Sequence, residues 1–429
     1  MIKLFIFSLP FLAFSLFTFE GNDLLVSYIT ALLLLFYLFV RKNDAKIHFP
    51  KEFKFIIYFV IYISASLIYR YLSGQSINNT FYSQLMTIII YSFFYLILIN
   101  IFIMQKIKRI SYYIHYFILI CVILSIYTSL QAFVSPDSML FHLFRNTNSS
   151  WRPILTLGGN YATWGNLNRV TGLGIEPMTW SAFLAIPLSI LFPRLIFKFR
   201  IKDLFSFLFI FICFLLTCSR TGWIAFALAI IYLPIFILTG IKRKIFVSIM
   251  TIFVCISSVV FINYYINNMK IRTDWSLLER MAGTNSSWNM FIDNPLIGIG
   301  YGGFSLKRDE YSVNYGPGVT GSYSYNYYIR LLGETGIIGF CLWILFIRSL
   351  LIKLFFQYKY IKENNKIKVF YLGLCMALLS ILFSWINVES INFMYMWFIF
   401  ALIGVLPVVM KKSLSDQGEL GISKTNINQ

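Results

Sequence analysis

Apolar residues run in long stretches along almost the whole chain, and short polar segments separate them. A helix needs about 20 mostly apolar residues to cross about 30 Å of hydrocarbon, and many stretches approach that length. The pattern predicts an all-α polytopic membrane protein with about 12 transmembrane helices. We place the spans near residues 4–19, 24–40, 55–71, 82–104, 111–133, 177–197, 203–217, 222–239, 245–266, 335–352, 369–387 and 391–410.

The composition agrees with this pattern. Hydrophobic residues make up 59% of the chain and charged residues 12%, and the mean hydropathy is +0.74. No polar stretch is long enough for a soluble domain, so residues 1–429 are predicted to form a single integral-membrane domain. The N-terminus resembles a signal peptide, but FTFEGND follows where a small-residue cleavage site is needed. We therefore interpret it as a retained first helix.

The distribution of cations predicts the orientation. Twelve spans place both termini on one side, and that side holds 25 of the 36 Lys and Arg residues, 19 of them lysine. The positive-inside rule makes this side cytoplasmic, and sorting the cations in this way removes the reason to expect a nucleic-acid partner. The outer side holds 11 cations, nine of them arginine. Because arginine grips phosphates and carboxylates in a bidentate manner, these residues indicate an anionic ligand outside.

Function is expected on the outer face, where two connections are long, at about 135–176 and 267–334. The connections on the other side are short, and the polar tail at 411–429 is predicted to be cytoplasmic and dispensable. In the second long loop Trp275, Leu278 and Met281 fall at helical spacing. They predict an amphipathic helix on the membrane surface.

The segment NRVTGLGIEPMTW places Arg169 seven residues before Glu176, and Pro177 opens an apolar helix. Proline suits the first helical position, and a carboxylate beside it favours the positive end of the helix dipole. Glu176 is therefore explained as a helix cap. An ionisable group at the membrane edge is equally a candidate for function, and the sequence leaves both interpretations open.

The segment SRTG joins two apolar spans on the outer side and contains Arg220. An arginine at a helix N-terminus opposes the helix dipole, so helix stability does not explain it. Snorkelling to a lipid phosphate is one explanation. A bound anion that satisfies both the arginine and the helix N-terminus is the other.

The segment NPLIGIGYGGF matches the spacing GxGxxG at Gly298, Gly300 and Gly303. A dinucleotide site is not expected, because no βαβ unit surrounds the motif and it lies on the predicted outer side. Two readings remain. The glycines permit close packing against a helix, or their backbone amides form a nest for an anion.

The segment SYNYYIRLLGETG runs into a span, and Asn326 and Arg330 share a helix face four residues apart. Glu334 is either functional or a cap at the helix entrance. Among the aromatic residues of this loop, Trp275, Trp288 and Tyr301 are candidates to stack on sugar rings. Alternatively, these aromatic side chains only lie at the membrane interface.

Other chemistry is not expected. The three histidines do not cluster, and the six cysteines show no CxxC spacing, so we expect no metal site and no disulfide framework. No Walker motif is present, and no cofactor is expected. Charged residues near span midpoints are scarce, which argues against a proton-coupled transporter.

Four motifs in order resemble the O-antigen polymerase and ligase family of bacterial envelope polysaccharide assembly. They are RVTGLGIEP, CSRTGW, ERMAG followed by NPLIGIGYGGF, and YNYYIRLLGETGIIG, and they cover roughly residues 165–345. Ligase-like members usually begin the last motif with His-Asn, whereas Tyr325 holds the histidine's place here. The glycine-Glu-Pro element around Glu176 is more similar to polymerases of the Wzy type.

The resemblance implies a GT-C-like, metal-independent glycosyltransferase in the bacterial inner membrane. It would polymerise undecaprenyl-pyrophosphate-linked oligosaccharide repeat units of O-antigen or a related surface polysaccharide on the outer face. Membrane lipids, and a chain-length-regulating co-polymerase, are the other expected partners. The alternatives are a ligase that transfers finished glycan to lipid A core or another acceptor, and a flippase or transporter of lipid-linked oligosaccharides.

The residues receive roles from this reading. A pyrophosphate leaving group needs charge stabilisation more than protonation, and fixed arginines supply it. Glu176 is the candidate general base toward the acceptor hydroxyl. The candidates for binding the donor pyrophosphate are Arg169, Arg220, Arg272 and Arg280, with Arg220 the strongest. Those expected to orient a sugar or phosphate are Tyr325, Asn326 and Arg330.

Overall fold

The computed structural model describes residues 1–11, 15–19, 22–25, 29–36 apart from 31 and 35, 47–74, 79–105, 107–133, 169–173, 176–249 apart from 239 and 247, 275–312, 319–358 apart from 320 and 322, 365–388 and 393–415. Within this part the chain is almost entirely helical. Six of the described helices are long and apolar enough to cross a membrane, and two shorter apolar helices accompany them. The chain is therefore a membrane protein.

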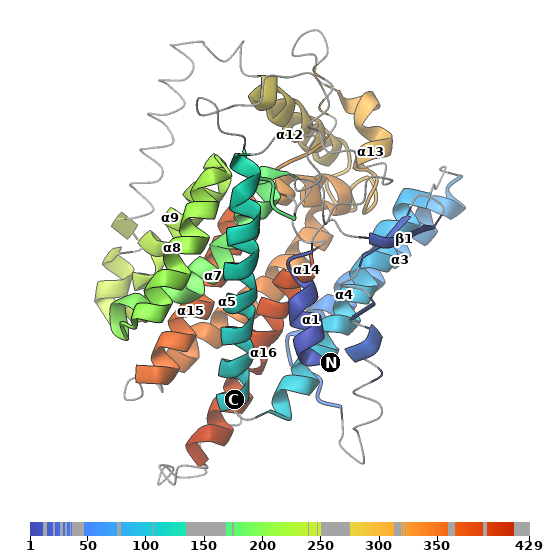
Figure 1. Cartoon of the computed structure of the whole chain (residues 1–429). Helices are drawn as coiled ribbons and strands as arrows, with labels where there is room; N and C mark the ends of the chain where they lie inside the picture. The colour runs from blue at the N-terminus through green and yellow to red at the C-terminus, as the bar shows by residue number, and fades with distance from the viewer. Residues whose placement is uncertain are drawn as a thin grey trace.

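The long helices stand side by side in a bundle, and α12 and α13 lie at one end of it (Figure 1). Proline and glycine set several of the helix boundaries, as at Pro177, which opens α7. The helices are α1 Ile2–Ser8, α3 Phe53–Leu72, α4 Asn79–Ile103, α5 Ile107–Ser129, α7 Pro177–Phe197, α8 Ile201–Leu216, α9 Arg220–Tyr232, α10 Pro234–Ile237, α12 Trp275–Asp293, α13 Phe304–Lys307, α14 Tyr327–Tyr358, α15 Asn365–Ser384 and α16 Met394–Ser415, with the short 3₁₀ helices η1 Leu130–Ala132 and η4 Arg308–Tyr311.

The first predicted span, near 4–19, is wrong. Helix α1 ends at Ser8, and β1 (Ser15–Phe19) pairs antiparallel with β2 (Asn22–Leu25). Pro10 lies just beyond this end and lacks the backbone N–H that would continue the hydrogen bonds of the helix. Most of the predicted spans near 24–40 and 245–266 lies outside the described residues. The count of 12 spans therefore stays a prediction.

The other nine predicted spans coincide with described helices, from α3 to α16. Their ends differ by a few residues, as at α16, which continues to Ser415 into the predicted tail. Most residues of helix α7 are buried, and it packs closely against α15. Gly373 permits this packing, because an added Cβ would lie 3.1 Å from the Cα of Ile190. Small residues at helix contacts are a general device for close packing in membranes.

A cluster of tryptophans joins α14, the end of α15 and α16. The ring centroid of Trp343 lies 6.0 Å from that of Trp385 and 6.1 Å from that of Trp397. All three side chains are fully buried. Rings at such separations gain stabilisation beyond the area that they bury, so this cluster fixes the helices that carry the site.

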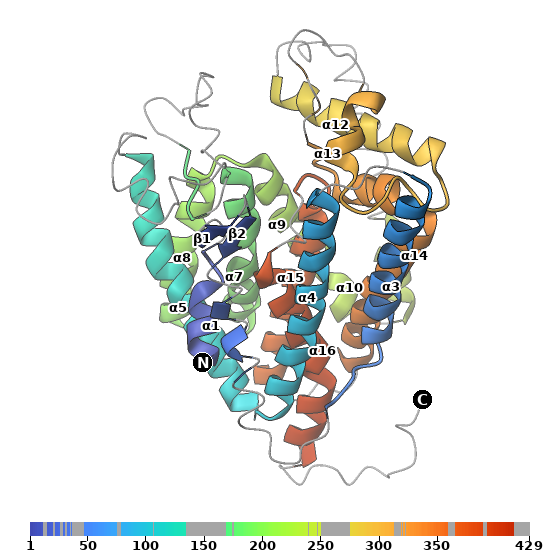
Figure 2. The ribbon, with the colours of Figure 1, turned by 90° about the vertical axis from the view of Figure 1, so that its right-hand side faces the viewer.

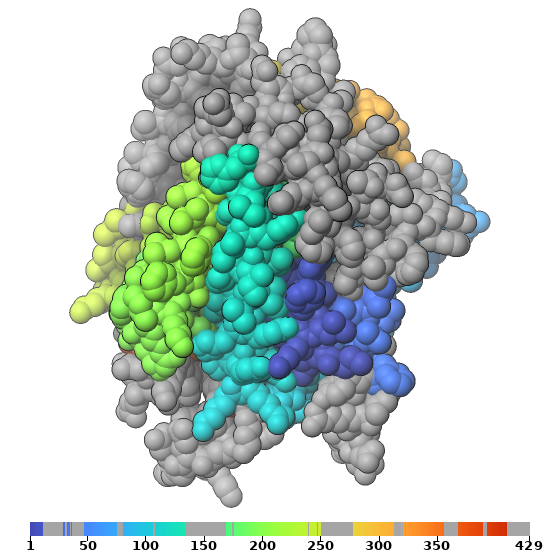
Figure 3. Space-filling model, viewed as in Figure 1, coloured from blue at the N-terminus to red at the C-terminus, as the bar shows by residue number. Residues whose placement is uncertain are grey.

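The outer surface of the bundle is apolar over long distances. In Figure 3 one face is formed largely by α5 and α8. Large apolar side chains are exposed on both helices, among them Leu119, Ile123, Phe209 and Ile212. A soluble protein rarely exposes such a face, and hydrocarbon is the solvent that suits it.

Candidate functional site

The glycine-rich turn at residues 294–304, NPLIGIGYGGF, packs against a kink in α14. Gly336 has φ 62° and ψ −170° inside this helix, which frees backbone groups near it. The N–H groups of Ile299 and Gly300 donate to the carbonyls of Gly333 (2.9 Å) and Glu334 (2.8 Å). An added Cβ on Gly298 would lie 2.4 Å from the carbonyl carbon of Glu334. The close-packing reading is therefore confirmed, and these two amides are already used by α14.

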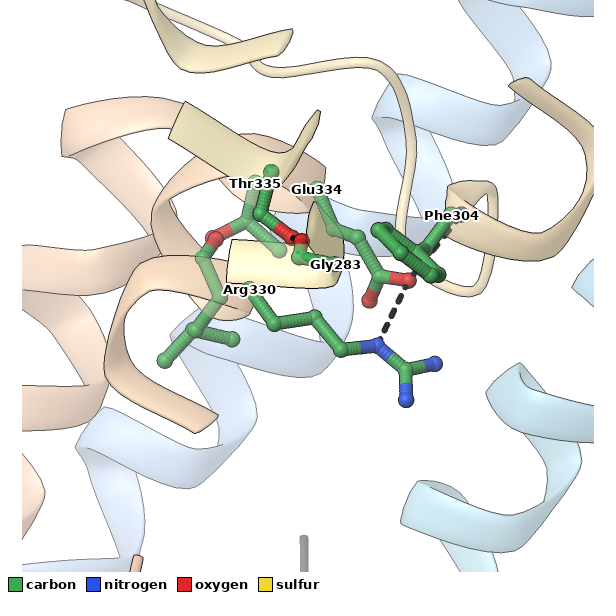
Figure 4. A network of polar contacts seen from close by, with 7 residues as sticks. Gly283, Phe304, Arg330, Glu334 and Thr335 are labelled. Atoms are coloured by element: carbon green, nitrogen blue, oxygen red, sulfur yellow. Dashed lines mark hydrogen bonds and ion pairs between the residues drawn. The ribbon is translucent and has the colours of Figure 1, made fainter. Parts of the chain in front are cut away.

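Glu334 is buried beneath this turn and pairs with Arg330 (Figure 4). Arg330 Nε donates to Glu334 Oε1 at 3.1 Å, and the backbone N–H of Phe304 donates to the same oxygen at 3.2 Å. Phe304 is the first residue of α13, so Glu334 caps α13 and not the helix that carries it. The guanidinium of Arg330 also lies 5.7 Å from the ring centroid of Phe304 and 5.4 Å from that of Tyr323.

Two residues of α3 hold the same region from the other side. Arg70 donates to the carbonyl of Gly298, and Tyr62 donates to the carbonyl of Thr335 at 2.7 Å. Arg70 is one of the 11 cations on the predicted outer side, and no motif pointed to Tyr62. The signal for Arg70 in the sequence was an arginine at the end of a long apolar run, because charged residues are rare in membrane spans.

The CSRTG turn between α8 and α9 is tied to the segment at Arg169. Arg169 donates to the carbonyls of Thr217 (3.2 Å) and Cys218 (3.1 Å), at the C-terminal end of α8. A cation there complements the negative end of the helix dipole. Cys218 has φ 48°, a left-handed conformation that non-glycine residues rarely adopt. No sequence motif predicts this strained turn.

Arg220 follows this turn as the first residue of α9, with Ser219 as the N-cap. Its side chain is exposed. The guanidinium therefore stands at the positive end of a helix dipole, where an anion would be attracted by both. Arg220 is also close enough to Arg169 to lower the pKa of the Arg169 guanidinium, in the same direction as the larger effect of burial.

Glu176 is the N-cap of α7 and forms a capping box with Thr179. The backbone N–H of Glu176 donates to Thr179 Oγ1 at 3.3 Å, and this hydroxyl donates to the Glu176 carbonyl at 2.8 Å. Glu176 thus occupies the N-cap position that the cap interpretation requires. Burial raises the pKa of the Glu176 carboxyl, and Arg280 and Arg169 act against this rise. A half-buried carboxyl between arginines is also suited to proton transfer.

Helix α12 brings Arg280 to the same place. The guanidinium of Arg280 lies 5.2 Å from the ring centroid of Tyr325, in the segment that leads into α14. Tyr325 packs against the small apolar cluster formed by Met178 and Ala182 of α7 and Val388. Burial raises the pKa of Tyr325 to about 12; the Glu176 carboxylate adds to the rise and Arg280 opposes it. Tyr325 is therefore protonated at neutral pH and is able to donate a hydrogen bond.

The candidates divide into two groups. Glu176, Arg169, Arg220, Arg280 and Tyr325 converge at the end of the bundle that α12 covers, and we call these five residues the arginine–glutamate cluster.

The remaining candidates lie elsewhere or serve the fold. Arg330 is buried in its pair with Glu334. Asn326 caps α14, because Ile329 N–H donates to Asn326 Oδ1 at 3.2 Å. Arg272 lies outside the described residues. Tyr301 is buried with its ring centroid 6.0 Å from that of Phe59, so it does not present a surface for a sugar.

Comparison with known families agrees with the motifs. Residues 205–344 match the family model described as O-antigen ligase. This confirms the resemblance to the O-antigen polymerase and ligase family. The match covers Arg220, Arg280 and Tyr325, whereas Arg169 and Glu176 lie before it. No curated protein matches the chain.

Proposed function

We propose that the chain joins lipid-linked oligosaccharides in surface polysaccharide synthesis, and specifically that it polymerises undecaprenyl-pyrophosphate-linked repeat units. The match of residues 205–344 to the family model described as O-antigen ligase supports this proposal. The observation that carries the proposal is that Arg169 and Arg280 both lie near enough to Glu176 to lower the pKa of its carboxyl, while Arg220 lies beside Arg169. Two cations beside one half-buried carboxyl, with a third cation next to Arg169, suit a reaction in which a pyrophosphate leaves and a hydroxyl loses its proton.

The chemistry assigns each group a step. The acceptor hydroxyl oxygen attacks the anomeric carbon of the donor sugar, and the bond from that carbon to the pyrophosphate oxygen breaks. The hydroxyl proton passes to the Glu176 carboxylate, and Arg220 and Arg280 stabilise the charge on the departing pyrophosphate. Arg169 is already bound to the end of α8, so it adds positive potential while it holds the turn that carries Arg220.

Tyr325 supports the polymerase over the ligase. It stands where ligase-like members usually have histidine, and with its pKa raised to about 12 it cannot accept a proton at neutral pH. Glu176 is then the group of the cluster left to act as the base. The ligase remains the second candidate, because the matching family model carries that description.

The polysaccharide of a deletion strain distinguishes the two. Loss of the polymerase leaves a single repeat attached to its normal acceptor, and this is the result that we expect. Finished polymer that is not attached to any acceptor would instead identify a ligase. A strain that accumulates lipid-linked repeats on the cytoplasmic side would contradict both and indicate a flippase.

We also propose that the cluster faces the outside of the inner membrane, with both termini in the cytoplasm. The basic turn between α7 and α8, with Lys198 and Arg200, lies at the opposite end of α7 from Glu176. Single cysteines introduced at Lys307 and at Lys202 report on this directly, in a cysteine-free background. A membrane-impermeant thiol reagent added outside should label the first and miss the second. The reverse pattern would overturn the orientation.

A further inference from the structure

A groove of about 580 Å³ lies between α3 and α4, away from the arginine–glutamate cluster. The two helices are neighbours on the side of the bundle that faces the viewer in Figure 2. Phe53, Ile57 and Ile61 line it from α3, spaced by four residues, and Phe93 and Ile97 line it from α4 with the same spacing. Residues four apart lie on one face of a helix, so the groove follows the helix axes.

The polar residues of the groove are committed to the backbone. Ser92 donates to the carbonyl of Ile88 at 2.6 Å, and Asn100 donates to the carbonyl of Leu96 at 2.8 Å. The Asn100 amide also accepts from the backbone N–H of His48 and donates to its carbonyl, at 2.8 and 3.1 Å. These bonds fix the segment before α3 at one end of the groove. The wall that remains is apolar and suits a hydrocarbon chain.

Two lysines stand at this same end. Lys51 and Lys54 are both exposed, and they flank Phe53, which lines the groove. Lys54 lies three and seven residues before Ile57 and Ile61, so its stem starts on the face that borders the groove. Basic residues beside a gap between membrane helices are a general way to hold anionic lipid head groups.

We propose that this groove binds an anionic phospholipid, with one acyl chain between α3 and α4 and the phosphate held by Lys51 and Lys54. An anionic head group suits the two ammonium groups better than a zwitterionic one, whose own cation repels them. The site is separate from the proposed pyrophosphate site, because the groove is lined by α3, α4 and the segment before α3, whereas Arg220 and Arg280 belong to α9 and α12.

The test compares purified protein in detergent with added phosphatidylglycerol or phosphatidylcholine of identical chains. A ligand that binds only the folded state raises the melting temperature. Phosphatidylglycerol should raise it more, and native mass spectrometry should show one phosphatidylglycerol retained. Lys51→Ala/Lys54→Ala should remove the difference between the lipids. Lys202→Ala/Lys242→Ala, which removes the same charge elsewhere from exposed positions, should keep it.

A second variant tests the groove itself. Ile57→Trp puts a large side chain into the groove at a position where Ile57 is 39% exposed, so the fold tolerates it. It should lose the retained phosphatidylglycerol while its melting temperature without lipid stays near that of the wild type. Equal stabilisation by both lipids, or unchanged retention by Ile57→Trp, would overturn the proposal. Displacement of phosphatidylglycerol by undecaprenyl phosphate would also overturn it and assign the groove to a substrate lipid.

Discussion

Arg280 lies over the ring of Tyr325, with 5.2 Å between the guanidinium carbon and the ring centroid. This contact joins α12 to the segment before α14. Tyr325 in turn packs against the cluster of Met178, Ala182 and Val388, the first two of which lie on α7, whose cap is Glu176. Three segments that are far apart in the sequence thus meet at one carboxyl. The proposed mechanism depends on this meeting, because a base and the cations that hold the leaving group must act on one substrate.

Arg220 tests whether the shape of the cation matters. Arg220→Lys keeps the charge but loses the planar fork that binds a phosphate through two hydrogen bonds. We expect a large loss of polymer while protein level and membrane insertion persist. Polymer length is measured on gels of cell-surface polysaccharide, and the partly exposed η4 residue Arg308 supplies the control Arg308→Lys. Near-normal polymer from Arg220→Lys would leave Arg220 as a residue that snorkels to lipid.

The pair of Arg330 and Glu334 is predicted to serve the fold. Arg330→Met leaves the Glu334 carboxylate buried without its partner, and breaking a buried pair in this way costs about 3–5 kcal/mol. We expect a clear fall in the melting temperature of the purified protein. Arg330→Met/Glu334→Gln removes both charges, and the amide still accepts from the N–H of Phe304, so much of the stability should return.

The double variant also separates the fold from substrate binding. If it regains stability and activity together, Arg330 acts through Glu334 and the glycine turn. If it is stable but inactive, Arg330 contacts substrate, as the sequence analysis expected. An Arg330→Met variant that melts like the wild type would contradict the structural role.

Hydrophobicity sufficed to predict nine of the long apolar helices, because a long apolar run has few other stable solutions in lipid. It failed at α1, where Pro10 interrupts the run. The motifs correctly placed Glu176 and Arg220 at helix starts. They did not reveal that Arg330 would pair with Glu334 rather than act with Asn326. This pairing depends on the glycine-rich turn and α13. They pack on α14, and Phe304 of α13 bonds to Glu334, 30 residues further along the chain.

The acid limb of the pH–rate profile reports on Glu176. Burial raises the pKa of this carboxyl above the ordinary value of 4.5, and Arg280 opposes the rise. A base works only when ionised, so the rate should fall as the pH drops through this raised pKa. Arg280→Met removes an influence that lowers the pKa, and the limb should therefore move to higher pH. An acid limb that stays in place, or moves to lower pH, would show that Arg280 does not influence the pKa of Glu176. The control Arg308→Met should leave the acid limb unchanged.

The cap role and the base role of Glu176 predict different effects on stability. A raised pKa means that the folded protein binds the proton more tightly than the unfolded chain, so the neutral carboxyl stabilises the fold at low pH. This contribution is lost as the pH rises through the folded pKa. Glu176→Gln is neutral at every pH, and its melting temperature at neutral pH should therefore equal or exceed that of the wild type. If the carboxylate served mainly the helix dipole, the variant would lose about 0.3–1 kcal/mol.

The most direct test of the account is polymerisation of a defined lipid-linked repeat unit in vitro by purified wild type and Glu176→Gln, with substrate binding measured separately. If Glu176 accepts the proton of the acceptor hydroxyl, the variant should bind the substrate as the wild type does and lose about 10²–10⁴-fold in rate. A variant that keeps more than about a tenth of the wild-type rate would lie outside the range expected for loss of a general base. Glu176 would then be a helix cap, and the proposed mechanism would be wrong.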